Sequence, residues 1–305
     1  MDDIQKRLLE EVADLHEIPT GAYNIRSNGA GAGRRSTEHI EITTKEDKPG
    51  INITIKDGTV RESVHIPVII SESGLTESVY NDFFIGENCD VTIIAGCGIH
   101  NCGTQKSEHD GIHTFFVGRN SRVRYVEKHY GEGDGNGLVV LNPQTIVHLA
   151  DGSYLEMETV QIKGVDSTIR TTSGDVADNA TLIIKEKIMT HGHQRAETNF
   201  TVDLNGENSA ANLISRSVAK DSSSQLFKSN IRGNSECRGH SECDAIIMDQ
   251  ASVAAVPELE ANCVEASLIH EAAIGKIAGE QLIKLMTLGL TEEEAEAMIV
   301  NGFLK

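Results

Sequence analysis

Large aromatic side chains are scarce in this sequence. It has no tryptophan, and only five tyrosines and seven phenylalanines among 305 residues. Proline is also rare, with five residues, whereas glycine is common, with 28. A core built around large aromatic anchors is therefore not expected. Many small layers joined by tight turns fit this composition better.

Basic residues are too few to balance the acidic ones. The 27 lysines and arginines face 46 aspartates and glutamates, which gives a net charge of −19. This balance argues against a nucleic-acid or anionic-membrane surface, since phosphate groups are bound by basic faces. No run of 18 apolar residues is present, and the acidic N-terminal segment lacks the apolar core of an export signal. We expect a soluble, cytoplasmic protein without nucleic-acid or membrane partners.

The first segment has the spacing of an amphipathic helix. Ile4, Leu8, Val12 and Leu15 fall on one helical face, and the helix is expected to end near Ile18-Pro19. The glycine-rich stretch 29–36 follows. It lacks the Gly-Lys-Ser/Thr ending of a phosphate loop, so we interpret it as a flexible turn. Residues 1–39 are assigned to an N-terminal helix and linker.

A seven-residue unit recurs between residues 40 and 267. It begins with an apolar residue, carries Asn, Asp, Gly or Gln before a small residue, and ends on the apolar residue that opens a strand. Copies occupy residues 85–91, 117–123, 149–155, 176–182 and 247–253, with a looser copy around 204–210. The step between copies is near 30 residues, and each leads into a strand with alternating apolar residues. Such repeats are typical of a β-solenoid, whereas a β-sandwich with regular turns is the alternative.

The pattern becomes helical again in residues 268–305. Ile274, Ile277, Ala278, Leu282 and Leu285 form one apolar stripe, which Gly289 closes. A capping box, Thr291 to Glu294, opens a second helix with an apolar face of Ala295, Met298 and Ile299. We therefore predict a mainly β protein with a solenoid over 40–267 and helices at both ends.

Cysteine and histidine gather in two places. One group contains Cys97, His100 and Cys102, followed by His109 and His113. The other contains Cys237, His240, Glu242, Cys243 and Asp244, followed by Cys263, His270 and Glu271. Thiolates combined with imidazole or carboxylate suit iron–sulfur clusters or zinc. Zinc-finger spacing is absent, so a closed structural zinc site is not expected. Cys89 takes the small-residue position of the repeat and is assigned to packing.

Motifs in the last third of the chain resemble the SufB/SufD family. They are RGHSECDA at 238–245, PELE at 257–260, HEA at 270–272 and the ordered residues of 294–303, and GRRSTE at 33–38 extends the likeness upstream. The family comprises scaffold subunits of the Suf iron–sulfur cluster assembly machinery. Its fold is a right-handed parallel β-helix flanked by helical segments. The shortness of this chain suggests a minimal form that pairs with itself rather than with a distinct SufD.

The resemblance implies roles for four residues. Cys243 matches the cysteine at the nascent-cluster site, Glu271 its carboxylate partner, and His270 the adjacent histidine at the subunit interface. Cys97 matches the position that receives sulfur, and its Gly-Cys-Gly context would let a sulfur donor approach an accessible thiolate. Cys102, Cys237 and Cys263 have no family counterpart.

The resemblance predicts a non-catalytic scaffold for a transient iron–sulfur cluster. Because this sequence has no nucleotide-binding motif, a separate SufC-type ATPase would drive the assembly. Its docking site would be residues 268–305, whose short, capped helices are amphipathic. A sulfur donor and apo iron–sulfur proteins would be the other partners, and the solenoid would mediate self-association. The sequence leaves two alternative interpretations. One is a β-helical enzyme acting on acidic polysaccharide; the other is a purely structural solenoid.

Overall fold

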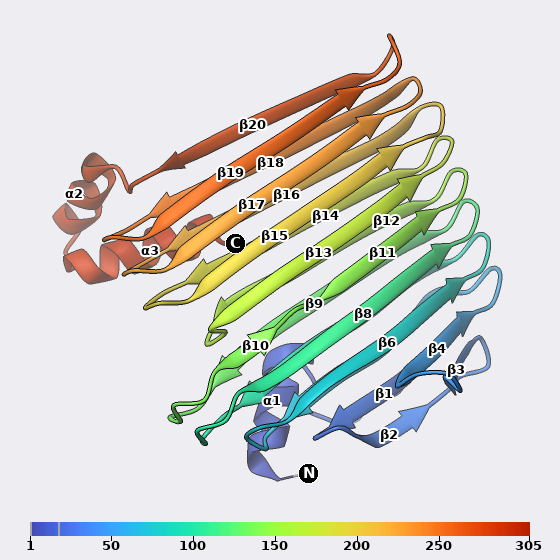
Figure 1. Cartoon of the computed structure of the whole chain (residues 1–305), viewed down its shortest axis with the longest axis horizontal. Coiled ribbons are helices and arrows are strands. Elements are labelled where there is room, and N and C mark those ends of the chain that lie inside the picture. The colour runs from blue at the N-terminus through green and yellow to red at the C-terminus, as the bar shows by residue number, and fades with distance from the viewer. Residues whose placement is uncertain (1, 18) are drawn as a thin grey trace.

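Two facing β-sheets build most of the molecule. The computed structural model describes residues 2–17 and 19–305, and within these residues each sheet contains ten strands. The chain alternates between the two sheets by turns at the two edges, so that each coil adds one strand to each wall of a flattened solenoid (Figure 1). The mainly β fold, with a parallel solenoid, a short N-terminal helix and C-terminal helices, is therefore confirmed.

The first sheet contains the strands that carry most of the candidate residues. Its order is β2-β1-β5-β7-β9-β12-β14-β16-β18-β20, parallel except for the β1–β2 pair. The strands are β1 (Ala22–Ser27), β2 (Ala30–Arg35), β5 (Val60–Ile70), β7 (Asp90–His100), β9 (Arg122–Glu132), β12 (Tyr154–Lys163), β14 (Thr181–Thr190), β16 (Ser209–Ala219), β18 (Cys237–Ile247) and β20 (Ser267–Gly275).

The second sheet has the order β19-β17-β15-β13-β10-β8-β6-β4-β3, with β11 also between β8 and β13. Its strands are β3 (Ile40–Thr44), β4 (Gly50–Ile55), β6 (Thr76–Ile85), β8 (Ser107–Val117), β10 (Val139–Leu141), β11 (Gln144–Leu149), β13 (Ser167–Val176), β15 (Arg195–Leu204), β17 (Ser224–Gly233) and β19 (Ser252–Ala261).

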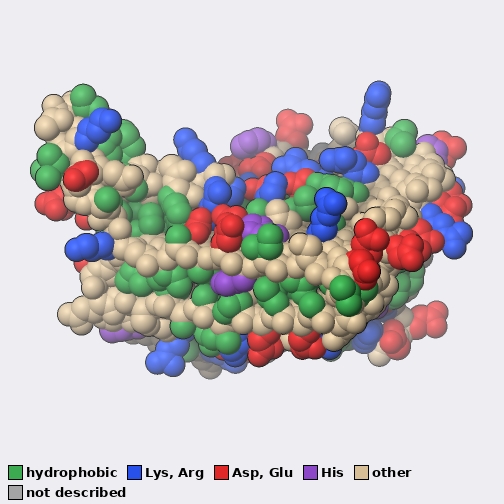
Figure 2. Space-filling model, turned by 90° about the horizontal axis from the view of Figure 1, so that it is seen from above, with side chains coloured by type: hydrophobic (Ala, Val, Ile, Leu, Met, Phe, Trp, Pro, Cys, Tyr) green, Lys and Arg blue, Asp and Glu red, His purple; other side chains and the backbone are tan. Residues whose placement is uncertain are grey.

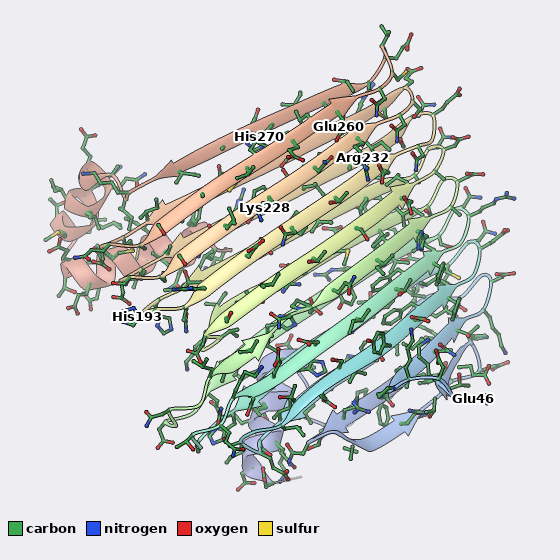
Figure 3. The ribbon with its side chains drawn as sticks, viewed as in Figure 1. Glu46, His193, Lys228, Arg232, Glu260 and His270 are labelled. Carbon is green, nitrogen blue, oxygen red and sulfur yellow. The ribbon has the colours of Figure 1, made fainter. Side chains whose placement is uncertain are left out.

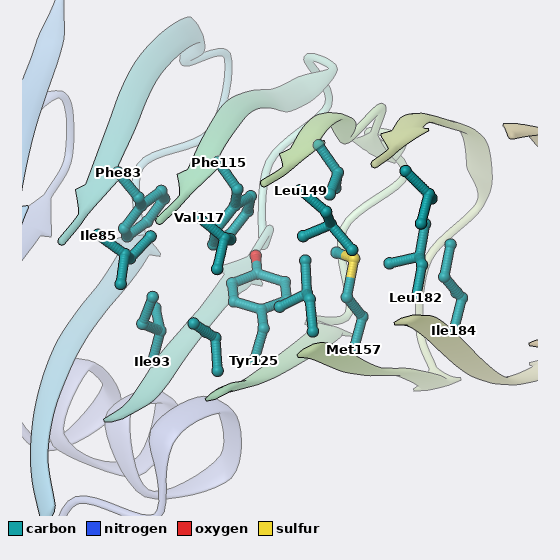
Figure 4. Packing of buried hydrophobic residues seen from close by; sticks show 14 of the residues in the cluster. Phe83, Ile85, Ile93, Phe115, Val117, Tyr125, Leu149, Met157, Leu182 and Ile184 are labelled. Atoms are coloured by element: carbon teal, nitrogen blue, oxygen red, sulfur yellow. The ribbon is translucent and has the colours of Figure 1, made fainter. Parts of the chain in front are cut away.

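Strict alternation along the strands places every second side chain in the narrow space between the sheets. In β14, for example, residues 182, 184, 186, 188 and 190 are all buried. Apolar side chains from the two walls interdigitate there (Figure 4). Phe83 and Phe115 stack with ring centroids 4.4 Å apart, and Tyr125 meets Phe115 edge-on. Phe200 and Phe227 form a second, edge-on aromatic pair nearer the C-terminal end, and the rest of the apolar core is mainly aliphatic.

The repeated turn is confirmed at one corner of the solenoid. Asn88, Asn120, Gly152, Asn179 and Asn208 all have φ between 55° and 68°, the left-handed region that favours Asn and Gly. The small residue that follows each of them is buried, which lets successive turns stack. Cys89 is one of these residues, 2% exposed, and its backbone N–H donates to Ser121 Oγ at 2.9 Å.

The copy at residues 247–253 lies at the opposite corner. It connects β18 to β19, whereas the other copies lead from the second sheet to the first. Asp249, with φ of 56°, takes the left-handed position there. The left-handed residue is thus the third of the unit here and the fourth at the first corner, with Gln250 between Asp249 and the small Ala251. The sequence unit is similar at both corners although the turns differ. The position of this copy at the second corner explains the longer step of 42 residues before it, about one and a half coils.

Helix α1 (Asp3–Ala13) covers the outer face of β7 and β9. Asp2 caps it, and Leu8 and Val12 are buried as predicted. The helix ends at Ala13, with Asp14 in the left-handed conformation, and Ile18, part of the predicted end, lies outside the described residues. The glycine-rich stretch is not a flexible turn: β1 and β2 form an antiparallel hairpin around Asn28-Gly29.

The predicted helical stripe starts too early. Ile274 belongs to β20, and α2 (Gly279–Thr287) begins five residues later. A parallel strand neighbour, β18, extends the sheet to Gly275, and this pairing overrides the local 3.6-residue spacing. Gly289, with φ of 97°, closes α2 as expected. The capping box of Thr291 and Glu294 opens α3 (Glu292–Phe303), with both predicted hydrogen bonds present.

The two C-terminal helices pack differently. Val300 and Leu304 of the α3 region are buried against Val218 at the end of β16. Helix α2 buries no residue and exposes Ile283 and Met286. Within the described residues, no helix is both long and apolar enough to cross a membrane.

The last coil leaves the interior open. Strands β19 and β20 each end their sheet, so each has one strand neighbour. Viewed toward this end, hydrophobic side chains show between two bands of backbone (Figure 2). Leu259 and Ile274 face inward by their register with Ile231 and Ala245, yet each is 39% exposed.

Candidate functional site

Cys243 lies one coil below the open end. It faces inward from β18 and is 1% exposed. Burial raises the pKa of the Cys243 thiol to about 12, and the charges of Glu186 and Asp244 add to the shift. The thiol is therefore protonated at neutral pH. A thiolate there requires a cation that replaces the proton, which a bound metal supplies.

His270 reaches the same interior from the edge strand β20 (Figure 3). It is registered with Ser241, and Ala272 is registered with Cys243, so His270 is two positions along the same inner face. Its buried Nδ1 atom has no hydrogen-bond partner. Buried polar atoms are nearly always partnered, so this nitrogen is a candidate ligand atom.

Glu271 is on the other side of the sheet. Its register partner is Glu242, in the outward-facing row of β18. The Glu271 side chain is 68% exposed, and its Oε2 atom lies 3.7 Å from Nε2 of His240. The fold thus brings Cys243 and His270 onto one face, whereas Glu271 meets His240 on the opposite face.

Cys97 is also an interior thiol. It faces inward from β7, is 2% exposed, and packs among apolar residues that include Val68 and Ile99. Burial raises the pKa of Cys97 well above its ordinary value, and the charges of Glu77 and Glu127 act in the same direction. The neighbouring glycines do not open a path to solvent, because Leu8 and Val12 of α1 lie against Gly98 and Gly96. The structure encloses the thiol that was expected to be accessible.

The remaining members of the first cluster lie in two places, and two of them, His109 and His113, face inward from β8 on either side of Gly111. His109 pairs with Glu77 at 3.2 Å, and His113 bonds to the Tyr125 hydroxyl at 2.8 Å. His100 and Cys102 form the other group, at the end of β7, with 2.8 Å between Nε2 and Sγ. Among residues 2–17 and 19–305, no three His, Cys, Asp or Glu side chains converge to hold a metal ion.

A line of polar side chains runs inside the first sheet and ends at Cys243. The register sets five residues side by side, and we call them the inner row: Glu127, Thr159, Glu186, Ser215 and Cys243. The Ser215 hydroxyl donates to Glu186 at 2.9 Å. All five are buried.

Arg170 joins the inner row to the neighbourhood of Cys97. It faces inward from β13, is 2% exposed, and lies 2.7 Å from Glu127 and 3.4 Å from Glu186. Its other terminal nitrogen lies 3.1 Å from His129 Nδ1, and His129 is the register partner of Cys97. Contacts therefore continue from the strand beside Cys97 to the strand beside Cys243.

One buried cation serves two carboxylates unequally. Burial by itself would raise the pKa of Glu127, but His129 and Arg170 hold it well below its ordinary value. At Glu186 burial dominates and the pKa is raised, although Arg170 opposes the shift. Glu127 is therefore the ionised partner of Arg170, and Glu186 is the carboxyl that protonates more readily.

The inner row and Arg170 were not predicted, although the sequence holds a signal for them. The apolar Val123 and Tyr125 indicate which side chains of β9 face the core, and the same alternation places Glu127 and His129 there. Leu182 and Ile184 likewise lead to Glu186. Charged residues at inward positions of solenoid strands mark this kind of polar interior.

These features define a class of protein: a parallel β-solenoid that encloses thiols and charged groups and ends in an open coil. Residues 71–303 match the family model described as SUF system FeS cluster assembly, SufBD core domain. The chain therefore belongs to the SufBD family of iron–sulfur cluster assembly proteins. This match disfavours both the polysaccharide enzyme and the purely structural solenoid.

Archaeal relatives bear the same family name. An iron–sulfur cluster assembly SufBD family protein of Methanothermobacter thermautotrophicus is 30% identical over 242 residues, 78% of this chain and 57% of the relative. One of Archaeoglobus fulgidus is 30% identical over 88% of this chain and 71% of its own length. One of Methanocaldococcus jannaschii is 28% identical, with 87% and 84% covered. The chain thus spans little more than half the length of the first of these relatives.

Proposed function

We propose that this protein is a non-catalytic scaffold on which an iron–sulfur cluster is assembled and from which it is passed to apo-proteins. The observation that carries the proposal is the position of Cys243 and His270 on one inner face at the open end of the solenoid. Few and mixed ligands suit a cluster that must leave, because four thiolates would hold it firmly. The cluster is cargo here, and its ligands would be Cys243, His270 and Glu271.

The open end supports self-association. Edge strands present unpaired N–H and C=O groups and pair readily with another chain. Pro257 has no backbone N–H and so interrupts the row of hydrogen-bond donors along β19, whereas β20 contains no proline. Strand β20 is therefore the better edge for pairing with a second copy. Pairing across a two-fold axis would place His270 and Glu271 of both copies at the interface. Glu271, which lies on the opposite face from Cys243 in its own chain, could then share a cluster with ligands of the second copy.

Helix α2 supports docking of a SufC-type ATPase on residues 268–305. Ile283 and Met286 of α2 are 63% and 42% exposed, and Leu288, which follows the helix, is 76% exposed, so the solenoid leaves these apolar side chains uncovered. Amphipathic helices with such faces bind in grooves of partner proteins. Cys97 would receive the sulfur for the cluster, which requires movement of α1 or of the strand ends, since the thiol is enclosed.

Replacing Cys243 tests the cluster site. The Cys243→Ala variant should lose cluster absorbance after anaerobic reconstitution with iron and sulfide, while its circular dichroism stays unchanged. The Cys89→Ala variant is the matched control, because Cys89 is equally buried but serves only a turn. It should bind as much cluster as the wild type. Undiminished cluster in Cys243→Ala would contradict the assignment.

A further inference from the structure

A cysteine, a histidine and a carboxylate are aligned at the surface end of β7. Sγ of Cys102 lies 2.8 Å from Nε2 of His100, and Nδ1 of the same ring lies 2.9 Å from a carboxylate oxygen of Glu132. The two ring nitrogens thus have different partners. Because Nδ1–H donates to the carboxylate, Nε2 is the nitrogen that accepts the thiol proton. This is the order of nucleophile, base and orienting group found in enzymes with activated thiols.

The fold holds the histidine and the carboxylate in place. His100 and Glu132 are the register partners that end β7 and β9, and each side chain is 15% exposed. Arg7 of α1 makes an ion pair with Glu132, and the Tyr130 hydroxyl donates to the same carboxylate at 3.2 Å. The base and its orienting group are therefore largely enclosed, while Cys102 is exposed.

Glycines allow a second turn to pack closely on the turn that carries the thiol. The turn after β9 lies directly on the turn after β7, with the N–H of Gly135 donating to Asn101 at 3.2 Å and that of Gly137 to Gly103 at 3.0 Å. A Cβ atom at Gly135 would overlap with the carbonyl oxygen of Gly103. These contacts explain the glycines at 133, 135 and 137, whereas Gly131 packs against Gly164 in the turn after β12.

Asp134 is a second acceptor for the same thiol. A hydrogen bond from Cys102 holds the pKa of Asp134 below its ordinary value. The groups around Cys102 are therefore His100, Glu132 and Asp134, with Arg7 behind Glu132. Cys263 offers a comparison within the chain: it is partly exposed and its thiol lies 3.1 Å from Glu265, and among residues 2–17 and 19–305 no histidine forms a hydrogen bond with it.

We propose that Cys102, with His100 as base and Glu132 as the group that orients it, is an activated surface thiol that accepts sulfane sulfur from a persulfide. His100 Nε2 takes the thiol proton, and Cys102 Sγ attacks the terminal sulfur of the donor. A new S–S bond forms as the S–S bond of the donor breaks. The donor sulfur leaves as a thiolate and takes the proton held by His100. One thiol and one persulfide exchange, without net oxidation or reduction.

This inference rests on the proposed scaffold function for its purpose, but its chemistry is independent of it. Cys102 stands five positions beyond Cys97 along the same chain segment. An exposed thiol with a base can meet a donor that the enclosed Cys97 does not meet. Cys102 would thus precede Cys97 in the delivery of sulfur to the interior.

Alkylation rates test the activation of Cys102. We expect iodoacetamide at pH 7 to modify Cys102 at least about tenfold faster than Cys263, as peptide mass spectrometry of the full chain would show. The His100→Gln variant should remove that difference, and Glu132→Gln should reduce it. His148→Gln is the matched control, since His148 is a surface histidine paired with Asp175 at 3.0 Å and has no thiol contact in the structure. Equal rates at both cysteines, or no effect of His100→Gln, would overturn the proposal.

Sulfur uptake tests the reaction itself. After incubation with glutathione persulfide, mass spectrometry should find added sulfur on Cys102 in the wild type and far less in His100→Gln. Added sulfur on Cys263 to the same extent would overturn the proposal. Cluster reconstitution with inorganic sulfide bypasses the donor, so Cys102→Ser should still bind cluster. If the wild type took up sulfur at Cys102 but bound no cluster from sulfide, the scaffold function would fail and this inference would stand.

Discussion

At the scale of single residues, the six cysteines differ most in their surroundings. Cys97 and Cys243 are buried with raised pKa values, so both are neutral thiols until a metal ion or a reacting partner replaces the proton. Cys102 is exposed beside a histidine. A protein that handles iron and sulfide needs both kinds: an exposed thiol reacts, whereas an enclosed thiol protects what it holds from water and oxidants.

Arg170 is the residue on which the charged interior depends. Replacing it with methionine leaves Glu127 and Glu186 buried without a cation, so the Arg170→Met variant should lose about 3–5 kcal/mol of stability at pH 7. In the wild type the lowered pKa of Glu127 contributes stability above the ordinary pKa of a glutamate, and this contribution is lost as the pH falls through the lowered value.

The stability of the Arg170→Met variant should depend on pH in the opposite direction. Without Arg170, burial raises the pKa of both carboxyls, so they protonate as the pH falls and the penalty shrinks. Urea denaturation at pH 7 and pH 5 would measure this, with a smaller loss expected at pH 5. A loss of stability that is the same at both pH values would show that packing, not charge, is the role of Arg170.

At the scale of elements, the strands and turns were predictable because each coil repeats the same local requirements. An apolar alternation, a left-handed Asn or Gly and a small residue recur in sequence, and their spacing indicates the coil length. The facing of single residues was less predictable. Adjacent His270 and Glu271 necessarily face opposite sides once they form a strand, and the sequence pattern of residues 268–285 indicated a helix instead. Pairing with β18 makes residues 267–275 a strand, and the local sequence pattern does not indicate this pairing.

Helix α2 provides a prediction for partner binding. We expect the Ile283→Glu variant to lose co-purification with a SufC-type ATPase, because the substitution places a charge on the exposed apolar face. The fold should remain intact, since Ile283 is 63% exposed. Met298→Glu is the control on α3, where Met298 is 53% exposed.

Removing residues 287–305 is the coarser version of this experiment. It should also abolish ATPase binding and spare self-association, but it uncovers Val218, so thermal stability must be measured alongside. Full ATPase recovery with both the deletion and Ile283→Glu would place docking elsewhere.

At the scale of the whole molecule, the unequal ends of the solenoid determine how it can associate. The N-terminal end is closed by the hairpins of β1–β2 and β3–β4, whereas the C-terminal end exposes its interior. We expect self-association through the last coil, and the Leu259→Lys variant should be monomeric by light scattering. Leu259 faces inward at this end and is 39% exposed.

Ile169→Lys is the matched control for this prediction. Ile169 is 50% exposed but lies on the outer face of β13, in the middle of its sheet. This variant should keep the oligomeric state of the wild type. If the wild type itself is a monomer, or if Leu259→Lys associates as the wild type does, the last coil is not the interface.

Because the asparagine turns stack one on another, distances along the solenoid are whole numbers of coils. From β7, which carries Cys97, to β18, which carries Cys243, the first sheet takes five steps. Each step is about 4.8 Å, so the two strands are about 24 Å apart. Because every coil meets the next in the same way, evolution or an engineer can add or delete one complete coil, but not a fraction of one. The distance between the two thiols can therefore change only in steps of one coil. Point mutations leave it fixed, whereas duplication of a segment of about 30 residues lengthens it by one strand spacing.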